Sequence, residues 1–188
     1  GMREGSIVVL AIIMGLMLAF DMGGPVNKVA YAFMLICVSQ GVYSVVAIAA
    51  VGIAVPPLGM GLATLIGRKD FTAEERETGK AALVMGCVGV TEGAIPFAAA
   101  DPLRVIPANM IGAASGCVTA ALMGAQCYAG WGGLIVLPVV QGKLGFVAAL
   151  LVGACVSAAC VILLKAFAKK KPTDVAADDE LDLDFEIN

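Results

Sequence analysis

The chain has 188 residues, of which 60% are hydrophobic and 14% are charged, whereas soluble domains average roughly 45–50% and about 25%. It contains no histidine, which excludes histidine-based zinc or haem sites and Ser-His or Cys-His nucleophiles. It also lacks a G-x-x-x-x-G-K-[ST] loop, so it does not hydrolyse nucleotide by itself. The few basic residues are interleaved with acidic ones, which argues against nucleic-acid binding. We predict no catalytic residue, no metal and no cofactor.

Uncharged segments predict helices that cross a membrane. They cover residues 29–67, 105–142 and 144–164, and an apolar stretch at 7–20 precedes them. A membrane-spanning helix needs about 20 apolar residues, so the first run is long enough for two helices, while the strongest later spans are 105–125 and 144–164. The stretch at 7–20 is interpreted as a membrane helix, because no small-residue cleavage pattern follows it. The predicted fold class is an all-α membrane protein with about five transmembrane helices and a re-entrant helical hairpin.

The first break between apolar runs is Asp21-Met22-Gly23-Gly24-Pro25-Val26-Asn27-Lys28, which is polar and rich in glycine. Unwound backbone at membrane depth is tolerated only where protein or water satisfies its polar groups. Two interpretations stay open. The segment either lines a binding site or forms a surface loop with Asp21 and Lys28 at the membrane interface.

Basic residues predict the side of the membrane on which two segments lie. The hydrophilic stretch 68–80 carries four of them, and Lys165, Lys169, Lys170 and Lys171 supply four more. By the positive-inside tendency both segments are cytoplasmic. Thr72 and Glu75 form a capping-box pattern that predicts the start of a short helix. We therefore divide the chain into a membrane part, 1–171, and an acidic, disordered cytoplasmic tail, 172–188, with the C-terminus in the cytoplasm.

A re-entrant hairpin follows from the number of crossings. Two cytoplasmic segments must be separated by an even number of spans, so residues 81–100 are expected to enter the membrane and return on the same side. Thr91-Glu92-Gly93-Ala94-Ile95-Pro96 lies at the centre of this segment, where Gly and Pro break the helix and Glu92 is the only charge. A charge at this depth usually faces a cavity or a partner. Glu92 either accepts hydrogen bonds from the hydroxyl groups of a neutral polyol, takes part in a proton relay or forms an ion pair with Arg104.

The next motif, Asp101-Pro102-Leu103-Arg104, opens a long helix. Asp101 is predicted to be its N-cap, with Pro102 at the first helical position. Arg104 has two candidate roles. It either pairs with Asp101 or Glu92, or it attracts the phosphate of an incoming donor.

Two predicted spans carry small residues at every fourth position. They are Gly112, Gly116, Ala120 and Gly124 in one span, and Gly145, Ala149, Gly153 and Ser157 in the other. Such stripes let helix backbones approach closely. We expect these helices to pack through the stripes, either on each other or on neighbouring helices.

Several long motifs together resemble a known family. They are residues 21–33 (DMGGPVNKVAYAF), residues 56–63 (PPLGMGLA) and residues 92–105 (EGAIPFAAADPLRV). They resemble, in order and spacing, the fructose-family enzyme IIC, the membrane domain of the bacterial phosphoenolpyruvate-dependent sugar phosphotransferase system. The match covers nearly the whole chain to about Lys171.

The resemblance implies a sugar permease of the bacterial inner membrane that takes up fructose or a related hexose. Phosphorylated enzyme IIB would convert the sugar to sugar phosphate, and the protein would be a homodimer among membrane lipids. It also implies that Thr91, Glu92 and Gly93 hold the sugar, with Asp21 and Asn27 lining or supporting the cavity. The alternative class is half of an ion-coupled secondary transporter, which also uses discontinuous helices.

Two departures from the family pattern concern missing parts. Family members carry further membrane helices ahead of the match, so the chain is expected to be the C-terminal half of a IIC domain. The chain also lacks the phosphorylated residue of the IIA or IIB components. The phosphate relay is therefore expected on other chains or on removed segments, and the assignment of the chain as an enzyme stays open.

Overall fold

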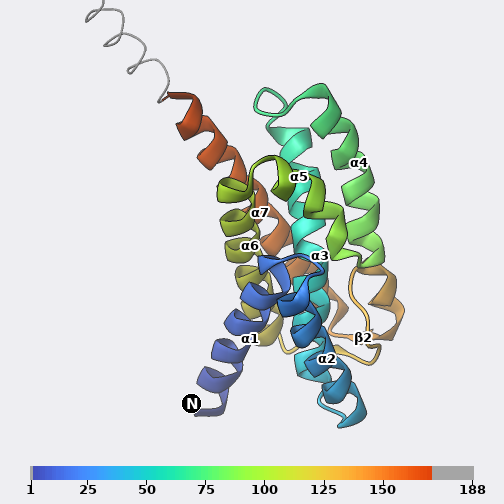
Figure 1. Ribbon diagram of the computed structural model, residues 1–188. Helices are drawn as coiled ribbons and strands as arrows, with labels where there is room; N and C mark the ends of the chain where they lie inside the picture. Colours follow the sequence, from blue (N-terminus) through green and yellow to red (C-terminus); the bar gives the residue numbers. More distant parts are fainter. Residues whose placement is uncertain (1, 171–188) are drawn as a thin grey trace, which may run out of the picture.

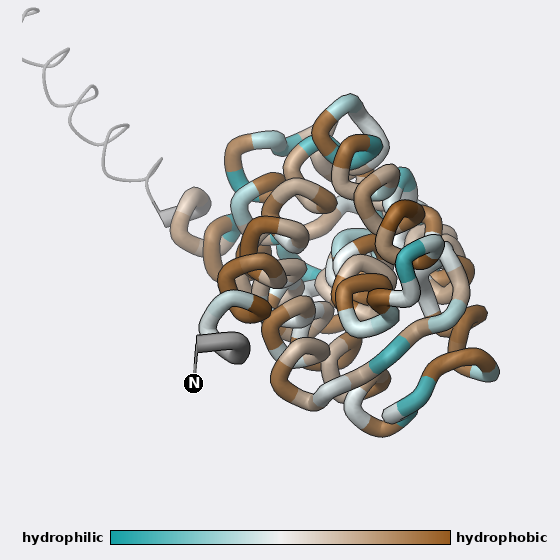
Figure 2. Tube along the Cα trace, turned by 90° about the horizontal axis from the view of Figure 1, so that it is seen from below, coloured by the Kyte–Doolittle hydropathy of each residue, from teal (hydrophilic) through white to brown (hydrophobic). Residues whose placement is uncertain are grey.

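The computed structural model describes residues 2–170 as a bundle of helices (Figure 1). Three helices are long and apolar enough to cross a membrane: α3 (Tyr43–Ile66), α6 (Pro102–Leu122) and α7 (Lys143–Lys170). Of these, α3 is the most buried, because α1, α4, α6 and α7 all pack around it. Seen along the bundle, hydrophobic residues follow the helices on all sides and hydrophilic segments are few (Figure 2). The predicted all-helical membrane class is confirmed.

Two helical hairpins reach the middle of the bundle from opposite ends. Helices α1 (Met2–Phe20) and α2 (Pro25–Ser39) rise from the lower end of Figure 1 and return to it. Helix α4 (Ala73–Val88) descends from the upper end, and the 3-10 helix η1 (Thr91–Ala94) with α5 (Ile95–Ala100) leads back up. We call these the α1–α2 hairpin and the α4–α5 hairpin. The second confirms that residues 81–100 enter and return at one end.

The start and end of α4 follow from local sequence signals. Thr72 Oγ1 accepts a hydrogen bond from the Glu75 amide at 3.1 Å, and Glu75 Oε2 accepts one from the Thr72 amide at 2.7 Å. These two bonds form the predicted capping box and satisfy two amides that a helix start leaves free. The helix ends at Gly89, whose φ of +84° lies in the left-handed region that glycine adopts without steric cost.

The start of α6 differs from the prediction in one respect. Pro102 occupies the first helical position as expected, but the Asp101 side chain makes no capping hydrogen bond. Its Oδ2 instead accepts a hydrogen bond from Arg104 Nη1 at 2.8 Å. Asp101 is therefore the N-cap residue of α6, as predicted, but its side chain does not cap the helix, because the carboxylate pairs with the guanidinium one turn along.

Helices α6 and α7 pack on each other through the predicted small-residue stripes. A Cβ built on Gly112 would lie 2.8 Å from the Gly153 carbonyl oxygen, and one built on Gly116 would lie 3.2 Å from Gly153 Cα. Backbones this close leave no room for larger side chains. Ser157 Oγ donates a hydrogen bond of 2.7 Å to Asn109 Oδ1 within the same buried contact. Gly124 takes no part, since it lies beyond the end of α6 with open space around it.

The link between α6 and α7 folds at the lower end. Strands β1 (Gln126–Cys127) and β2 (Val140–Gln141) pair antiparallel, with the 3-10 helix η2 (Leu134–Val139) between them. Residues 128–133, which we call the 128–133 loop, lie against the end of α4, where Trp131 Nε1 donates to the Val88 carbonyl at 2.7 Å. A segment 43 residues further along the chain thus contacts the α4–α5 hairpin.

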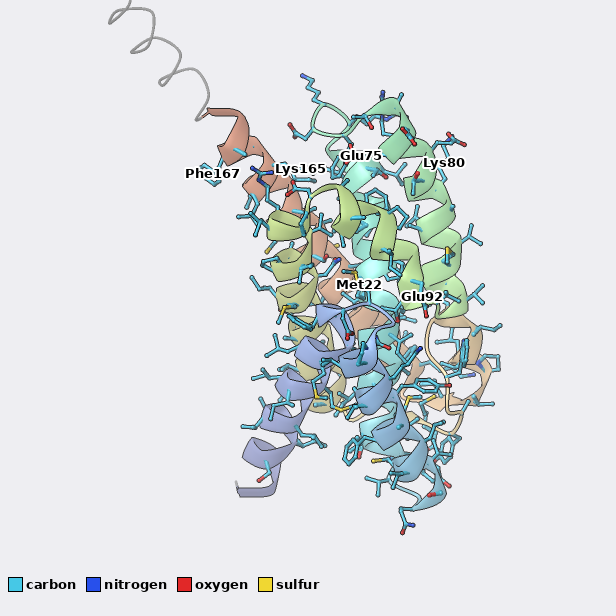
Figure 3. All side chains as sticks on the ribbon, viewed as in Figure 1. Met22, Glu75, Lys80, Glu92, Lys165 and Phe167 are labelled. Atoms are coloured by element: carbon cyan, nitrogen blue, oxygen red, sulfur yellow. The ribbon has the colours of Figure 1, made fainter. Side chains whose placement is uncertain are left out.

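The predicted basic segments meet at the upper end. Lys165 of α7 forms an ion pair of 2.9 Å with Glu75 of α4, and its Nζ lies 4.1 Å from the centre of the Phe71 ring. Figure 3 shows Glu75 and Lys165 together at this end. The α3–α4 connection and the end of α7 therefore lie at one end of the bundle, as the even number of crossings required. The predicted acidic tail, 172–188, lies outside the described residues.

Candidate functional site

The tips of the two hairpins meet halfway along the bundle. A Cβ built on Gly23 would lie 2.8 Å from Glu92 Oε1, so the two turns are in contact. Figure 3 shows Met22 and Glu92, one from each tip, at similar height. A cavity of about 220 Å³ opens there, which we call the central cavity. It is lined by Gly23, Asn27, Lys28, Tyr31, Ile53, Gly89, Thr91, Glu92 and Trp131.

Asp21 fixes the start of α2 below this cavity. Its Oδ2 accepts a hydrogen bond from the Val26 amide at 2.7 Å, and its Oδ1 accepts one from the Asn27 amide at 2.9 Å. Pro25 has no amide hydrogen, and the Lys28 amide bonds to the Gly24 carbonyl. The carboxylate therefore supplies the missing acceptors of the first turn, where the helix dipole also favours a negative charge. Asp21 supports the cavity and does not line it.

Asn27 and Lys28 stand on the first turn of α2 and line the cavity. Asn27 is buried, and its Nδ2 donates to the Leu18 carbonyl at 2.6 Å. This bond ties the start of α2 to the end of α1. Lys28 is exposed and contributes a positive charge to the cavity. Gly23, Asn27 and Lys28 of the 21–28 segment thus line a cavity, and the role of this segment in binding stays a prediction.

Thr91 positions the tip of the α4–α5 hairpin on the central helix. Helix α3 contains Pro56 and Pro57, and a proline in a helix cannot donate to the carbonyl four residues earlier. Pro57 therefore leaves the Ile53 carbonyl without its helical partner. The buried Thr91 Oγ1 donates to this carbonyl at 3.0 Å. The hydroxyl of Thr91 is thereby engaged with protein, although the residue also borders the cavity.

Gly93 and Glu92 have opposite surroundings. Gly93 is buried against α3 and α4, and a Cβ there would lie 3.0 Å from Met85 Cβ and 3.1 Å from Pro57 Cβ. Gly93 lets the tip pack closely and does not border the cavity. Glu92 is exposed to the cavity, and its carboxylate has no hydrogen bond or ion pair within residues 2–170. Its oxygens are available to a ligand.

Arg104 lies apart from these residues. It starts α6 at the upper end of the bundle, where it pairs with Asp101, and it does not line the central cavity. Of its candidate partners, the structure selects Asp101 and not Glu92. The Arg104 side chain remains 40% exposed, and its role toward a phosphate donor stays a prediction.

Two aromatic residues complete the cavity and were missed in the sequence. Tyr31 of α2 and Trp131 of the 128–133 loop have ring centres 6.2 Å apart and planes at 88°. Tyr31 Oη donates to the Gly130 carbonyl at 3.0 Å. Trp131 is the only tryptophan in the chain and stands between glycines in an uncharged link. That isolated aromatic residue was the available signal, but spacing alone does not reveal that the loop reaches α4.

The cavity combines few polar groups with apolar and aromatic walls, which is typical of sites for small ligands. Glu92 accepts hydrogen bonds, Lys28 donates them, and the rings supply flat apolar surface. The volume is below the roughly 300–1,000 Å³ of sites for drug-sized ligands, so a small polar molecule suits it. Within the described part of the chain, no group of three or more acidic or cysteine side chains is placed to hold a metal.

Known proteins with similar sequences are sugar-system components. The chain is 78% identical, over its whole length, to the "Fructose-like permease IIC component 2" of Escherichia coli, of which it covers 53%. It is 48% identical over 88% of its length to a "PTS system fructose-specific EIIB'BC component" of Xanthomonas campestris, covering 29% of that protein. The chain is also 37% identical, over 93% of its length, to a "PTS system fructose-specific EIIC component" of Haloferax volcanii, and it covers 47% of that protein. No family model and no solved structure matches.

The chain spans about half the length of the two relatives named as IIC components alone, and less of the one that joins B and C components. The similarity runs through both hairpins and the long helices, since it covers 88% or more of the chain in each case. Together with the helical membrane fold, this extent of identity shows that the chain resembles the fructose-type IIC components of the phosphotransferase system over most of its length.

Proposed function

We propose that the chain is the sugar-binding part of a fructose-type phosphotransferase permease, and that the central cavity receives fructose or a related hexose. Glu92 accepts hydrogen bonds from sugar hydroxyls, and Lys28 and Asn27 contact the ligand from the opposite tip. Thr91, Gly93 and Asp21 hold the two tips in place. The relatives' printed names, which specify fructose, support this substrate class.

One observation carries the proposal. The Glu92 carboxylate is exposed to the central cavity, halfway along the helical bundle, without a partner in the described chain. A charge at such a depth costs about 2.5–3.5 kcal/mol on insertion scales, and a helical anchor has no need of it. A ligand with several hydroxyl groups would satisfy both carboxylate oxygens.

The test is Glu92→Gln in the complete transport system, assembled in vesicles with the neighbouring encoded segments. We expect sugar phosphate to form only when phosphorylated enzyme IIB is present, and the variant to abolish it while the protein still inserts. Glu77→Gln is the matched control, because Glu77 lies on the same hairpin but is exposed at the upper end. Unchanged uptake by Glu92→Gln would remove the role of Glu92, and free sugar accumulating on an ion gradient would favour the secondary transporter.

We further infer that the upper end of the bundle faces the cytoplasm of a bacterium and meets phosphorylated enzyme IIB. The positive-inside tendency supports this orientation, because the basic segment 68–80 and Lys165 lie there. Relatives that join B and C components in one chain support the partner. A reporter enzyme active only in the cytoplasm, fused after Asn188, tests the side. We also propose that the protein is a homodimer and that membrane lipids cover its remaining apolar surface. Cross-linking in native membranes tests the homodimer.

A further inference from the structure

The 128–133 loop forms one wall of the central cavity although it belongs to neither hairpin. Three contacts fix it there. Trp131 Nε1 donates to the Val88 carbonyl at 2.7 Å, the Gly133 amide donates to the Ala50 carbonyl at 3.3 Å, and Gly130 accepts from Tyr31. The loop is therefore held to α4, α3 and α2 at once, and the side chain of Trp131 is positioned before any ligand arrives.

Trp131 is partly accessible at the cavity. The residue is 44% exposed and lines the cavity, while the indole nitrogen is bonded to the Val88 carbonyl. Tryptophan is also common at membrane interfaces, where the indole meets lipid headgroups. That role does not fit here, because the indole N–H is bonded to the hairpin tip halfway along the bundle.

Sugar rings present rows of C–H groups as well as hydroxyls. The face of an aromatic ring carries partial negative charge and attracts the partly positive hydrogens of such rows. A cavity that binds a hexose therefore gains from a flat ring near the acceptor that binds its hydroxyls. The central cavity places Trp131, braced at a right angle by Tyr31, together with Glu92.

We infer that Trp131 is a sugar-stacking residue, which selects ligands with a C–H face and binds them jointly with Glu92. This inference rests on the proposed function of the central cavity. Trp131 is expected to act on binding and not on the phosphoryl transfer itself, so its loss should raise KM for the sugar and leave kcat nearly unchanged.

Three variants in the complete system test this role. Trp131→Leu should raise KM for D-fructose about threefold to tenfold, the range given by one aromatic contact. Trp131→Phe keeps a ring but loses the N–H bond to Val88, and it should stay near the wild-type KM. Tyr128→Leu is the matched control, because Tyr128 lies on the same loop with 42% exposure but does not line the cavity. A KM that rises equally in Trp131→Phe and Trp131→Leu would overturn stacking in favour of positioning through Val88.

Fluorescence gives a second readout that does not rely on KM. The chain contains one tryptophan, so the difference in emission between the wild type and Trp131→Phe in the same complete system reports on this ring alone. Adding D-fructose to a preparation that phosphorylates it should shift the emission, and Glu92→Gln should weaken that shift. An unchanged emission would overturn the inference. If Glu92→Gln abolishes phosphorylation but Trp131→Leu leaves KM unchanged, only the stacking role fails; if Glu92→Gln transports normally, the proposed function fails as well.

Discussion

Replacing Asp21 should destabilise the α1–α2 hairpin, and the loss of stability should grow with the number of hydrogen-bond acceptors that the substitution removes. In Asp21→Ala the amides of Val26 and Asn27 both lose their acceptor. Losing an N-cap costs about 0.5–2 kcal/mol, and hydrogen bonds to charged groups contribute about 1.5–3 kcal/mol. Asp21 is half-buried, so water replaces part of this loss. We expect a decrease of about 2 kcal/mol in the free energy of unfolding.

Asp21→Asn keeps one acceptor oxygen and should cost about 1 kcal/mol, half as much. Thermal unfolding in detergent measures the order wild type, Asn, Ala. Glu77→Ala is the control, since its ion pair with Lys80 is exposed and such pairs contribute little. The two Asp21 variants should also raise KM for the sugar, because α2 carries Asn27 and Lys28 into the cavity. An Asp21→Ala protein as stable as the wild type would refute the capping role.

Two further predictions concern helix packing and pH. Gly116→Leu should sharply reduce the yield of folded protein in detergent, because a Cβ there would already lie 3.0 Å from the Ala149 carbonyl oxygen. Gly5→Leu is the control and should keep the wild-type yield, because a Cβ on Gly5 has no neighbour within 4 Å. Equal yields of the two variants would contradict the packing of α6 on α7. Burial alone would raise the pKa of Glu75, but hydrogen bonds from Lys165 and Thr72 lower it below its ordinary 4.5. A lowered pKa in the folded state stabilises the fold above that ordinary pKa, and this contribution is lost as pH falls through the folded value. Thermal stability at acid pH should therefore fall less steeply in Glu75→Gln than in the wild type, and parallel curves would exclude the ion pair as the cause.

The sequence predicted the elements whose signals are local. The capping box at Thr72 and Glu75 and the hairpin around Glu92 were expected, and the stripes of α6 and α7 were expected to pack on each other or on neighbouring helices. The first depends on residues within one helical turn, the second on the number of crossings, and the third on a repeat within each helix. The assignment of Asp101 as a side-chain cap failed because Arg104, in the next turn, competes for the same carboxylate.

What the sequence did not predict depends on contacts between distant segments. The acceptor for Thr91 is a carbonyl 38 residues earlier, and it is free only because of Pro57. Trp131 reaches the end of α4 from 43 residues away. Asp21 caps a helix from outside the usual N-cap position, since a tight turn brings it back to the amides of Val26 and Asn27. No periodicity encodes such contacts.

The bond between Thr91 and the Ile53 carbonyl has a mechanical consequence. A helix backbone is uniform along its length, so a hairpin that packed on it through side chains alone could settle one turn, about 5.4 Å, higher or lower. The carbonyl released by Pro57 breaks that uniformity and gives the tip a single matching height on α3. In the proposed transport, sliding the α4–α5 hairpin along α3 would break this hydrogen bond and leave the Ile53 carbonyl without a partner.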